Sequence, residues 1–282
     1  MKRSKSFESE NNLLYLVATP IGNMSEVSER TISILSSVDV VAAEDTRNTG
    51  SLLAKLGISK ELFSLREHNE NEASEYVIQL IKSGKKVAYV SDAGYPGISD
   101  PGYLLVKNAL REDIRVSTIS GPCAFINALV ASGLETNHFY FHGFLPAKDG
   151  EAKKELEKLK EREETLIFYE SPHRINRMLI NLNDVLGNRK AVIARELTKL
   201  NEEYIRGRLL ELIEIDESTL KGEMVVLVEG NKEKPVVNEQ KIRERVGYYM
   251  ERGYSKKDAA EKVSEELDIP KNQIKKLIMT ED

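Results

Sequence analysis

Hydrophobic residues recur along the first half of the chain in short continuous runs, separated by longer segments in which they recur at helical spacing. The runs of strand length are 13–18 (LLYLVA), 38–43 (VDVVAA), 86–90 (KVAYV) and 114–119 (IRVSTI). The segments between them, such as RTISILSS and ASEYVIQLIKSG, have the period of an amphipathic helix. Continuous hydrophobicity is typical of strands that are buried on both faces. The pattern therefore predicts an α/β architecture with a largely parallel sheet.

A second series of strand-length runs follows at 138–144 (HFYFHGF), 165–170 (TLIFYE), 191–197 (AVIAREL) and 223–230 (EMVVLVEG). The helical segment FINALVASG ends just before this series, so a boundary is expected near residues 134–137. We predict two α/β domains, 13–135 and 136–234, with a cofactor cleft between them. Residues 1–12 have no hydrophobic pattern and are expected to form a flexible tail.

The pattern changes after Lys234-Pro235, and residues 235–282 carry helical periodicity only. Three short helices are expected, with Ser255 and Pro270 as helix-start signals. Their spacing resembles a helix-turn-helix. A small bundle that only packs on the rest of the protein is an equally open interpretation.

Composition excludes several classes of protein. The single cysteine, Cys123, excludes an intramolecular disulfide and a cysteine-cluster zinc site, and it fits a reducing compartment. A formal net charge of −5 argues against indiscriminate binding of nucleic acid. His138 and His142 fall in an expected strand, where their spacing favours no metal site. With no apolar segment of membrane-spanning length, we expect a cytoplasmic protein and no contact with a membrane.

The chain contains the pattern Ser-Asp-x-Gly-Tyr twice, at 91–95 and at 99–103. In the first copy Pro96 disfavours a helix, which predicts an irregular loop after a buried strand. In the second copy we expect Asp100 to cap a helix whose first residue is Pro101.

Three predicted strand ends are rich in glycine and proline: TPIGN (19–23), SDAGYPG (91–97) and SGPCA (120–124). Each alone is typical of a tight strand–helix turn, but three in neighbouring positions of one sheet favour a bound ligand. Neither common pyrophosphate-binding glycine motif is present. Small side chains and Asp92 suit an uncharged ring or a cationic ligand.

Several further motifs occur in a fixed order: AAEDTR (42–47), GFLPAK (143–148), FYESPHR (168–174), ARELTK (194–199) and GEMVVLVEG (222–230). Together with the three loops they resemble the ribosomal small-subunit methyltransferase I family, a branch of the tetrapyrrole-methylase-type S-adenosylmethionine enzymes. The resemblance extends from about Leu14 to Gly230. The chain departs from the usual family pattern at Tyr95, where threonine is usual, and at Ser120, where proline is usual.

The resemblance implies a two-domain α/β homodimer that binds S-adenosylmethionine, without a metal, in the cleft between its domains. It implies methylation of the ribose 2′-oxygen of a decoding-centre cytidine, cytidine 1402 of 16S rRNA, in the small ribosomal subunit. By similarity, the cofactor-binding residues are Pro20, Asp92, Ala93, Gly94, Ile98, Cys123, Ala124, Tyr169 and Leu197. Simple structural roles are the alternative, such as a helix-start residue for Cys123 and a core residue for Leu197.

A ribose hydroxyl is a poor nucleophile, so a base or a group that stabilises the alkoxide is expected near it. We predict Glu170 as the base or hydroxyl-orienting group and Arg174 as a phosphate or alkoxide contact. Structural ion pairs across the cleft are the alternative for both. Other polar residues of the motifs are also candidates: Asp45, Arg47, His173, Glu196 and Lys199.

Two other functions compete with this interpretation. A tetrapyrrole C-methylase would use similar cofactor loops with a pocket for a carboxylate-rich macrocycle, but FYESPHR and ARELTK argue against it. A helix-turn-helix regulator with a ligand-sensing body would need basic residues concentrated on one helix. The segment KKDAAEKVSEELD instead mixes both signs of charge.

Overall fold

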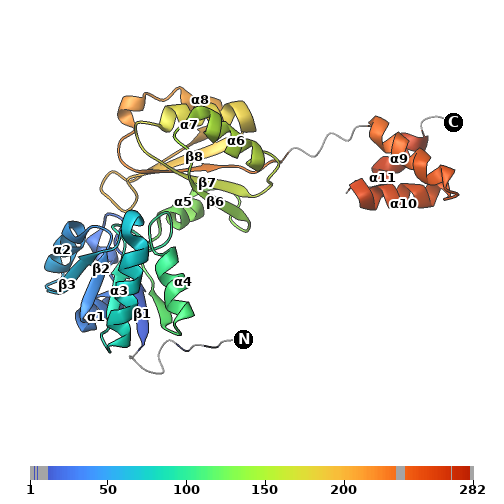
Figure 1. Ribbon diagram of the computed structural model, residues 1–282. Coiled ribbons are helices and arrows are strands. Elements are labelled where there is room, and N and C mark those ends of the chain that lie inside the picture. The colour runs from blue at the N-terminus through green and yellow to red at the C-terminus, as the bar shows by residue number, and fades with distance from the viewer. Residues whose placement is uncertain (1–2, 4, 6–11, 233–238, 268, 280–282) are drawn as a thin grey trace. The chain divides into compact units, whose positions relative to one another are not determined.

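The structure is a computed structural model that describes residues 3, 5, 12–232, 239–267 and 269–279 (Figure 1). It divides into two compact units, Met1–Asn231 and Lys232–Asp282. We call the first the α/β body and the second the helical unit. Most of the predicted tail, and the Lys-Pro break at 234–235, lie outside the described residues.

The first sheet of the α/β body is formed by the first series of hydrophobic runs. It has five parallel strands in the order β3-β2-β4-β1-β5, which confirms the predicted parallel sheet. The strands are β1 (Leu13–Val17), β2 (Val40–Ala43), β3 (Glu61–Ser64), β4 (Val87–Val90) and β5 (Arg115–Ile119). The sequence pattern missed β3, an edge strand whose residues are only partly buried.

Helices cover both faces of this sheet. Tyr89 and Leu14 pack on one face with α3 (Glu70–Lys82) and α4 (Tyr103–Arg111). Tyr15 and Val41 pack on the other face with α1 (Glu29–Ser37) and α2 (Thr46–Lys55). The remaining helices of this part of the chain are η1 (Met24–Glu26), η2 (Glu67–Asn69) and α5 (Ala124–Ser132).

The second sheet has the order β6-β7-β10-β8-β9 and is mixed. Only β6 and β7 are parallel neighbours, and the other neighbouring pairs are antiparallel. The strands are β6 (Phe139–Phe144), β7 (Thr165–Glu170), β8 (Lys190–Arg195), β9 (Glu203–Arg208) and β10 (Met224–Val228). The sequence pattern missed β9, which lies at the sheet edge and is partly exposed.

Both faces of the second sheet are also covered. One face packs against α6 (Asp149–Leu159), α7 (Ile175–Leu186) and α8 (Leu209–Ile213), and η3 (Glu217–Thr219) follows α8. The other face packs against α5, through Ala128 and Leu129. The predicted boundary at 135/136 assigns α5 to the first domain, whereas its hydrophobic contacts are with the second sheet.

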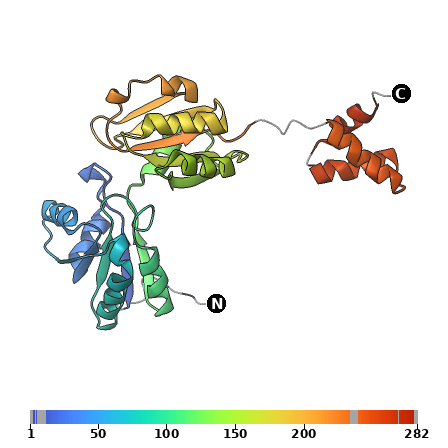
Figure 2. The same ribbon diagram turned by 45° about the horizontal axis from the view of Figure 1, so that its top comes forward.

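The helical unit contains the three helices expected from the sequence: α9 (Glu239–Glu251), α10 (Lys256–Leu267) and α11 (Lys271–Met279). Figure 2 shows them, in red, packed against one another. Ile242, Val246, Val263 and Ile274 form their small core. Ser255 begins α10 as predicted, because its hydroxyl accepts a hydrogen bond from the Asp258 amide at 3.2 Å.

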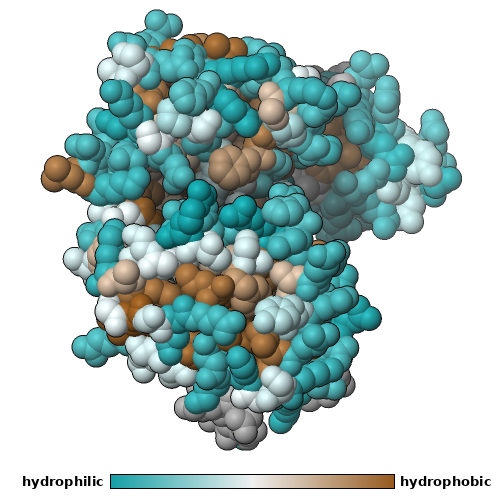
Figure 3. All heavy atoms as spheres, turned by 60° about the vertical axis from the view of Figure 1, so that its left-hand side comes forward, coloured by the Kyte–Doolittle hydropathy of each residue, from teal (hydrophilic) through white to brown (hydrophobic). Residues whose placement is uncertain are grey.

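The surface of the α/β body includes exposed hydrophobic residues. On the face shown in Figure 3 hydrophilic residues predominate, but hydrophobic residues gather in its lower half. Large hydrophobic side chains are exposed on α4 (Tyr103 and Leu110), on α5 (Val130) and on β6 (Phe139). Such side chains, when grouped, are typical of surfaces that bind another protein.

Candidate active site

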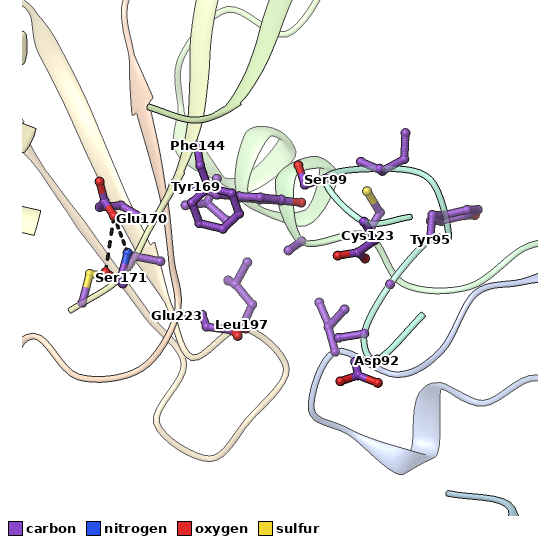
Figure 4. Close-up of a pocket in the computed structure, with 18 of the residues that line it drawn as sticks. Asp92, Tyr95, Ser99, Cys123, Phe144, Tyr169, Glu170, Ser171, Leu197 and Glu223 are labelled. Atoms are coloured by element: carbon purple, nitrogen blue, oxygen red, sulfur yellow. Dashed lines mark hydrogen bonds between the residues drawn. The ribbon is translucent and has the colours of Figure 1, made fainter. Parts of the chain in front are cut away.

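A cavity of about 430 Å³ in the α/β body is lined by residues from both sheets. Loops after β1, β2, β4, β5, β7 and β8 contribute to it, as do the last residue of β6 and the chain around the start of β10 (Figure 4). In α/β proteins ligands bind beyond the carboxyl ends of parallel strands, and the first sheet follows this rule. The volume is within the range of small-molecule sites, about 300–1,000 Å³.

Hydrogen bonds join the three glycine- and proline-rich loops to one another. The amide of Thr19 donates to the Gly94 carbonyl at 2.9 Å, and the Gly94 amide donates to the Thr19 carbonyl at 3.0 Å. The Tyr95 hydroxyl accepts a hydrogen bond from the Gly121 amide at 3.2 Å. Tyr95, which stands where the resembling family usually has threonine, therefore links the SDAGYPG loop to the SGPCA loop.

Gly94 has a φ of +76°, which is unfavourable for any residue with a side chain. A Cβ at this position would meet its nearest heavy atoms at 3.7 and 3.9 Å, an ordinary contact distance. Backbone conformation, and not lack of space, is therefore the reason for glycine here.

The second copy of the repeated pattern differs from the prediction. The helix α4 begins at Tyr103, its N-cap is Gly102, and Asp100 lies ahead of the helix instead of capping it. The buried carboxylate of Glu70 takes the capping role: its Oε1 accepts from the amides of Gly102 at 2.8 Å and Leu104 at 2.9 Å. A distant residue thus supplies the acceptor that the helix start requires, and Asp100 lines the cavity.

Asp92 lines the cavity and also holds the start of α2. Its Oδ1 accepts from the Asp45 amide at 3.1 Å, and its Oδ2 accepts from Asn48 Nδ2 at 2.8 Å. The Asp92 amide in turn donates to Glu44 Oε2 at 3.3 Å. The acidic residue of the SDAGYPG loop is therefore tied to the AAEDTR motif.

The cavity is predominantly acidic, with five carboxylates besides Glu170 and one lysine. The carboxylates belong to Glu44, Asp92, Asp100, Glu196 and Glu223. Lys199 donates to Glu196 Oε1 at 2.9 Å, so its charge is locally compensated. An excess of negative charge favours a cationic ligand, one of the two ligand classes that the sequence suggested.

Burial and neighbouring charges shift the titration of several cavity groups. Burial, with the negative charges of Glu44 and Asp92, raises the pKa of Asp100 to about 7. Burial also raises the pKa of Glu44. The pKa of the Cys123 thiol is raised by burial as well, which keeps this thiol protonated and argues against a nucleophilic role.

Glu170 and Arg174, the predicted catalytic pair, form hydrogen bonds and an ion pair within the protein. Glu170 is buried, and its Oε1 accepts from the Ser171 amide at 2.8 Å. Its Oε2 lies 3.3 Å from Arg174 Nη2, which also donates to the Leu145 carbonyl at 2.9 Å. Glu170 lines the cavity, whereas Arg174 lines a small adjoining depression.

The other predicted site residues are mostly together in the cavity. Those that line it are Asp92, Ala93, Gly94, Ile98, Cys123, Ala124, Tyr169 and Leu197. Pro20 does not line it and lies between Thr19, which pairs with Gly94, and Ile21, which is in the lining. Lining residues that the prediction missed include Glu44, Ser99, Asp100, Phe144 and Glu223. The repeated Ser-Asp pattern was the available signal for Ser99 and Asp100.

Backbone strain gathers around the same cavity. Ser99, Glu196 and Thr198 have positive φ values, of 61°, 50° and 68°. A Cβ at Gly22 would lie 2.6 Å from Lys199 Cγ, so TPIGN and ARELTK meet closely. Strained residues of this kind are typical of ligand-binding loops.

In the described part of the chain, no helix is long and hydrophobic enough to cross a membrane. Among the same residues, no group of three or more His, Cys, Asp or Glu side chains is placed to hold a metal ion.

The fold is shared with several solved structures. The crystal structure of the methyltransferase CobJ matches with a TM-score of 0.59 at 17% identity, covering 79% of this chain and 96% of that one. A crystal structure of diphthine synthase also matches with a TM-score of 0.59, at 16% identity, covering 77% of this chain and 89% of that one. At these identities the likeness establishes the fold only.

Sequence relatives cover almost the whole chain. Ribosomal RNA small subunit methyltransferase I of Bacillus subtilis is 41% identical, with 97% of each chain covered. The protein of the same name from Halalkalibacterium halodurans is 43% identical, covering 97% of this chain and 98% of that one. The one from Escherichia coli O157:H7 is 45% identical over 82% of each. The family model of tetrapyrrole (corrin/porphyrin) methylases matches residues 13–213. With loops, cavity and sequence in agreement, the chain belongs to the ribosomal RNA small subunit methyltransferase I family, within the tetrapyrrole methylases.

Proposed function

We propose that the protein transfers a methyl group from S-adenosylmethionine to the ribose 2′-oxygen of cytidine 1402 in 16S rRNA. The observation that carries the proposal is the identity of 41–43% to two ribosomal RNA small subunit methyltransferases I along nearly the entire chain. The substrate is the small ribosomal subunit, and the protein acts in the cytoplasm.

The cavity fits S-adenosylmethionine chemically. When bound, this cofactor supplies a methyl group on a positively charged sulfonium, and the excess of carboxylates in the cavity would favour that charge. Tyr169, Leu197 and Ile98 offer hydrophobic surface for an adenosine, while the backbone of Ala93, Gly94 and Ala124 offers hydrogen-bonding groups. We assign Asp92 and Cys123 to the same site, and Pro20 to its support.

For the predicted catalytic pair we propose a positioning role. Glu170 holds Ser171 and Arg174, and the Arg174 side chain is about one-third exposed beside the cavity. A guanidinium in that position can contact a phosphate of the RNA backbone, since arginine suits phosphate oxygens. Glu170 then helps to orient the ribose hydroxyl indirectly, by holding Ser171 and Arg174 in place.

We also propose a homodimer and retain the domain limits 13–135, 136–234 and 235–282. The exposed hydrophobic residues on α4, α5 and β6 support the dimer, because a second copy would remove them from water. The helical unit is proposed to improve docking on the ribosomal subunit.

A tetrapyrrole substrate is the second candidate, because the fold is shared with enzymes that methylate such rings. The negative charge of the cavity argues against a tetrapyrrole substrate. Glu44, Asp92, Asp100 and Glu223 would repel a macrocycle that carries many carboxylates.

The test is to incubate the protein with S-adenosylmethionine carrying a labelled methyl group and with small subunits that lack the modification. The labelled nucleoside is then identified by mass. A ribose 2′-O-methyl removes the internal nucleophile for alkaline cleavage, so the labelled linkage should survive alkali. Subunits that already carry the modification are the control and should take up no label. Label on a base, or a labelled linkage cut as readily as its neighbours, would contradict the proposal.

A further inference from the structure

We propose that Asp100 is the general base of this site, the group that accepts the proton of the acceptor hydroxyl as the methyl group is transferred. The inference rests on the proposed function. It extends that function by assigning the base to a residue other than Glu170 and Arg174, which the sequence motifs favoured. It is carried by the placement of Asp100, by what its neighbours do, and by the charges around it.

The chain fixes Asp100 at the cavity from both sides. The Pro101 carbonyl accepts hydrogen bonds from the Tyr89 hydroxyl at 2.9 Å and from the Gly97 amide at 3.0 Å. Beyond it, Glu70 holds the first turn of α4. Figure 4 shows the preceding residue, Ser99, on the same loop as Tyr95 and on its side toward Tyr169. Asp100 therefore lies on a loop that hydrogen bonds hold in place, and it lines the same cavity as the β7 residues Tyr169 and Glu170.

Asp100 has no structural task comparable to those of the other carboxylates. Asp92 holds the start of α2, and Glu170 holds Ser171 and Arg174. Glu196 pairs with Lys199. The Ser91 side chain lies close enough to favour the ionised form of Asp100, and within the described part of the chain Asp100 forms no ion pair. The helix cap that its sequence context suggests is supplied by Glu70, so Asp100 is left for the ligand.

The groups that face Asp100 come from several elements and are mostly negative. The negative or polar groups are Glu44 after β2, Ser91 and Asp92 after β4, and Glu223 before β10. The phenol groups of Tyr89 on β4 and Tyr169 on β7 also interact with Asp100, and the pKa of each is raised, chiefly by burial. Lys199, after β8, is in the same lining but is paired with Glu196. Burial and these negative charges raise the pKa of Asp100 to about 7. A base is most effective when its pKa lies near the operating pH, which an ordinary exposed aspartate does not satisfy.

The proposed step conserves atoms and electrons. The hydroxyl proton passes to the Asp100 carboxylate while the electron pair of the hydroxyl oxygen forms the new bond to the methyl carbon. The pair of the broken carbon–sulfur bond stays on sulfur, whose positive charge is neutralised. Asp100 then releases its proton to water, and no oxidant, reductant or metal is consumed.

The test compares wild type with Asp100→Asn, which keeps the shape and removes the base. Single-turnover methyl transfer to unmodified subunits is measured across about pH 5–9. The wild-type rate should rise with pH through about 7, because only the ionised carboxylate accepts a proton. Asp100→Asn should be slower at neutral pH by a factor on the order of 10²–10⁴. Its affinity for S-adenosylmethionine, measured by calorimetry, should fall by less than about tenfold, the factor that 1.4 kcal/mol represents, because the other carboxylates of the cavity remain.

A second variant, Glu223→Gln, tests the assignment without touching the base. Removal of this negative charge should lower the pKa of Asp100 and move the acidic limb of the rate profile to lower pH. A carboxyl-carbon NMR titration of the free protein should show the same displacement for the Asp100 resonance. Asp113→Asn, an exposed aspartate away from the cavity lining, is the matched control and should leave rate and profile unchanged.

The outcomes separate this inference from the proposed function. If wild type transfers no methyl group to the subunits, the proposed function fails and the inference fails with it. If wild type is active and Asp100→Asn keeps its rate and its acidic limb, only the inference fails. Loss of cofactor affinity in folded Asp100→Asn would make Asp100 a binding residue and also overturn it. An acidic limb that does not move in Glu223→Gln has the same consequence.

Discussion

The buried carboxylate of Glu70 should make a large contribution to stability, because it caps a helix that begins 33 residues further along the chain. Its Oε1 accepts two short hydrogen bonds from the first turn of α4, at 2.8 and 2.9 Å, and a longer one of 3.4 Å from the Leu105 amide. Substitution by alanine removes the acceptor and leaves these amides without their partner in a buried setting.

A hydrogen bond to a charged group contributes about 1.5–3 kcal/mol, so the two short bonds together represent about 3–6 kcal/mol. Water that enters the space left by the side chain recovers part of this, and we expect Glu70→Ala to lower the free energy of unfolding by about 3–4 kcal/mol. Glu70→Gln keeps a neutral acceptor and should lose only about 1–2 kcal/mol, because neutral bonds are roughly half as strong.

The assay is urea unfolding of wild type and both variants, with hydrogen exchange at the amides of Gly102 and Leu104 as the local measurement. Glu72→Ala, at an exposed position of the same helix, is the control and should change stability by no more than about 0.5 kcal/mol. A loss of less than about 1 kcal/mol in Glu70→Ala, or equal stability of the Gln and Ala variants, would show that Glu70 does not stabilise the start of α4.

Two further predictions concern the cofactor loop and the helical unit. Gly94→Val should weaken binding of S-adenosylmethionine in calorimetry by about 5- to 150-fold while the fold persists, because a β-branched residue at a φ of +76° costs about 1–3 kcal/mol of strain in the loop. Wild-type affinity in this variant would contradict the role of the loop. A chain that ends at Asn231 should bind the cofactor with unchanged affinity and methylate subunits with a higher apparent KM, because the helical unit has its own core. Loss of cofactor binding, or unaltered kinetics, would each contradict a docking role for the helical unit.

Local patterns in the sequence were sufficient wherever short-range physics decides the structure. The continuous hydrophobic runs at β1, β4 and β10 predicted buried strands, since a strand covered by helices on both faces has no polar side. Ser255 predicted the start of α10, because a hydroxyl can reach an amide three residues away. Glycines and prolines after three strands predicted the loops that the structure joins around one cavity.

Tertiary structure alone decided whatever depends on residues far apart in the chain. Hydrophobic runs report burial but not direction, so the antiparallel pairs of the second sheet could not be predicted from them. The edge strands β3 and β9 are only partly buried and gave no clear pattern. At the site, Asp100 has every local feature of a helix cap, yet Glu70 reaches the helix from another element and takes that role. Only the folded chain brings Glu44, Asp92 and Glu223 toward Asp100, and that long-range proximity, together with burial, gives this carboxyl its unusual affinity for a proton.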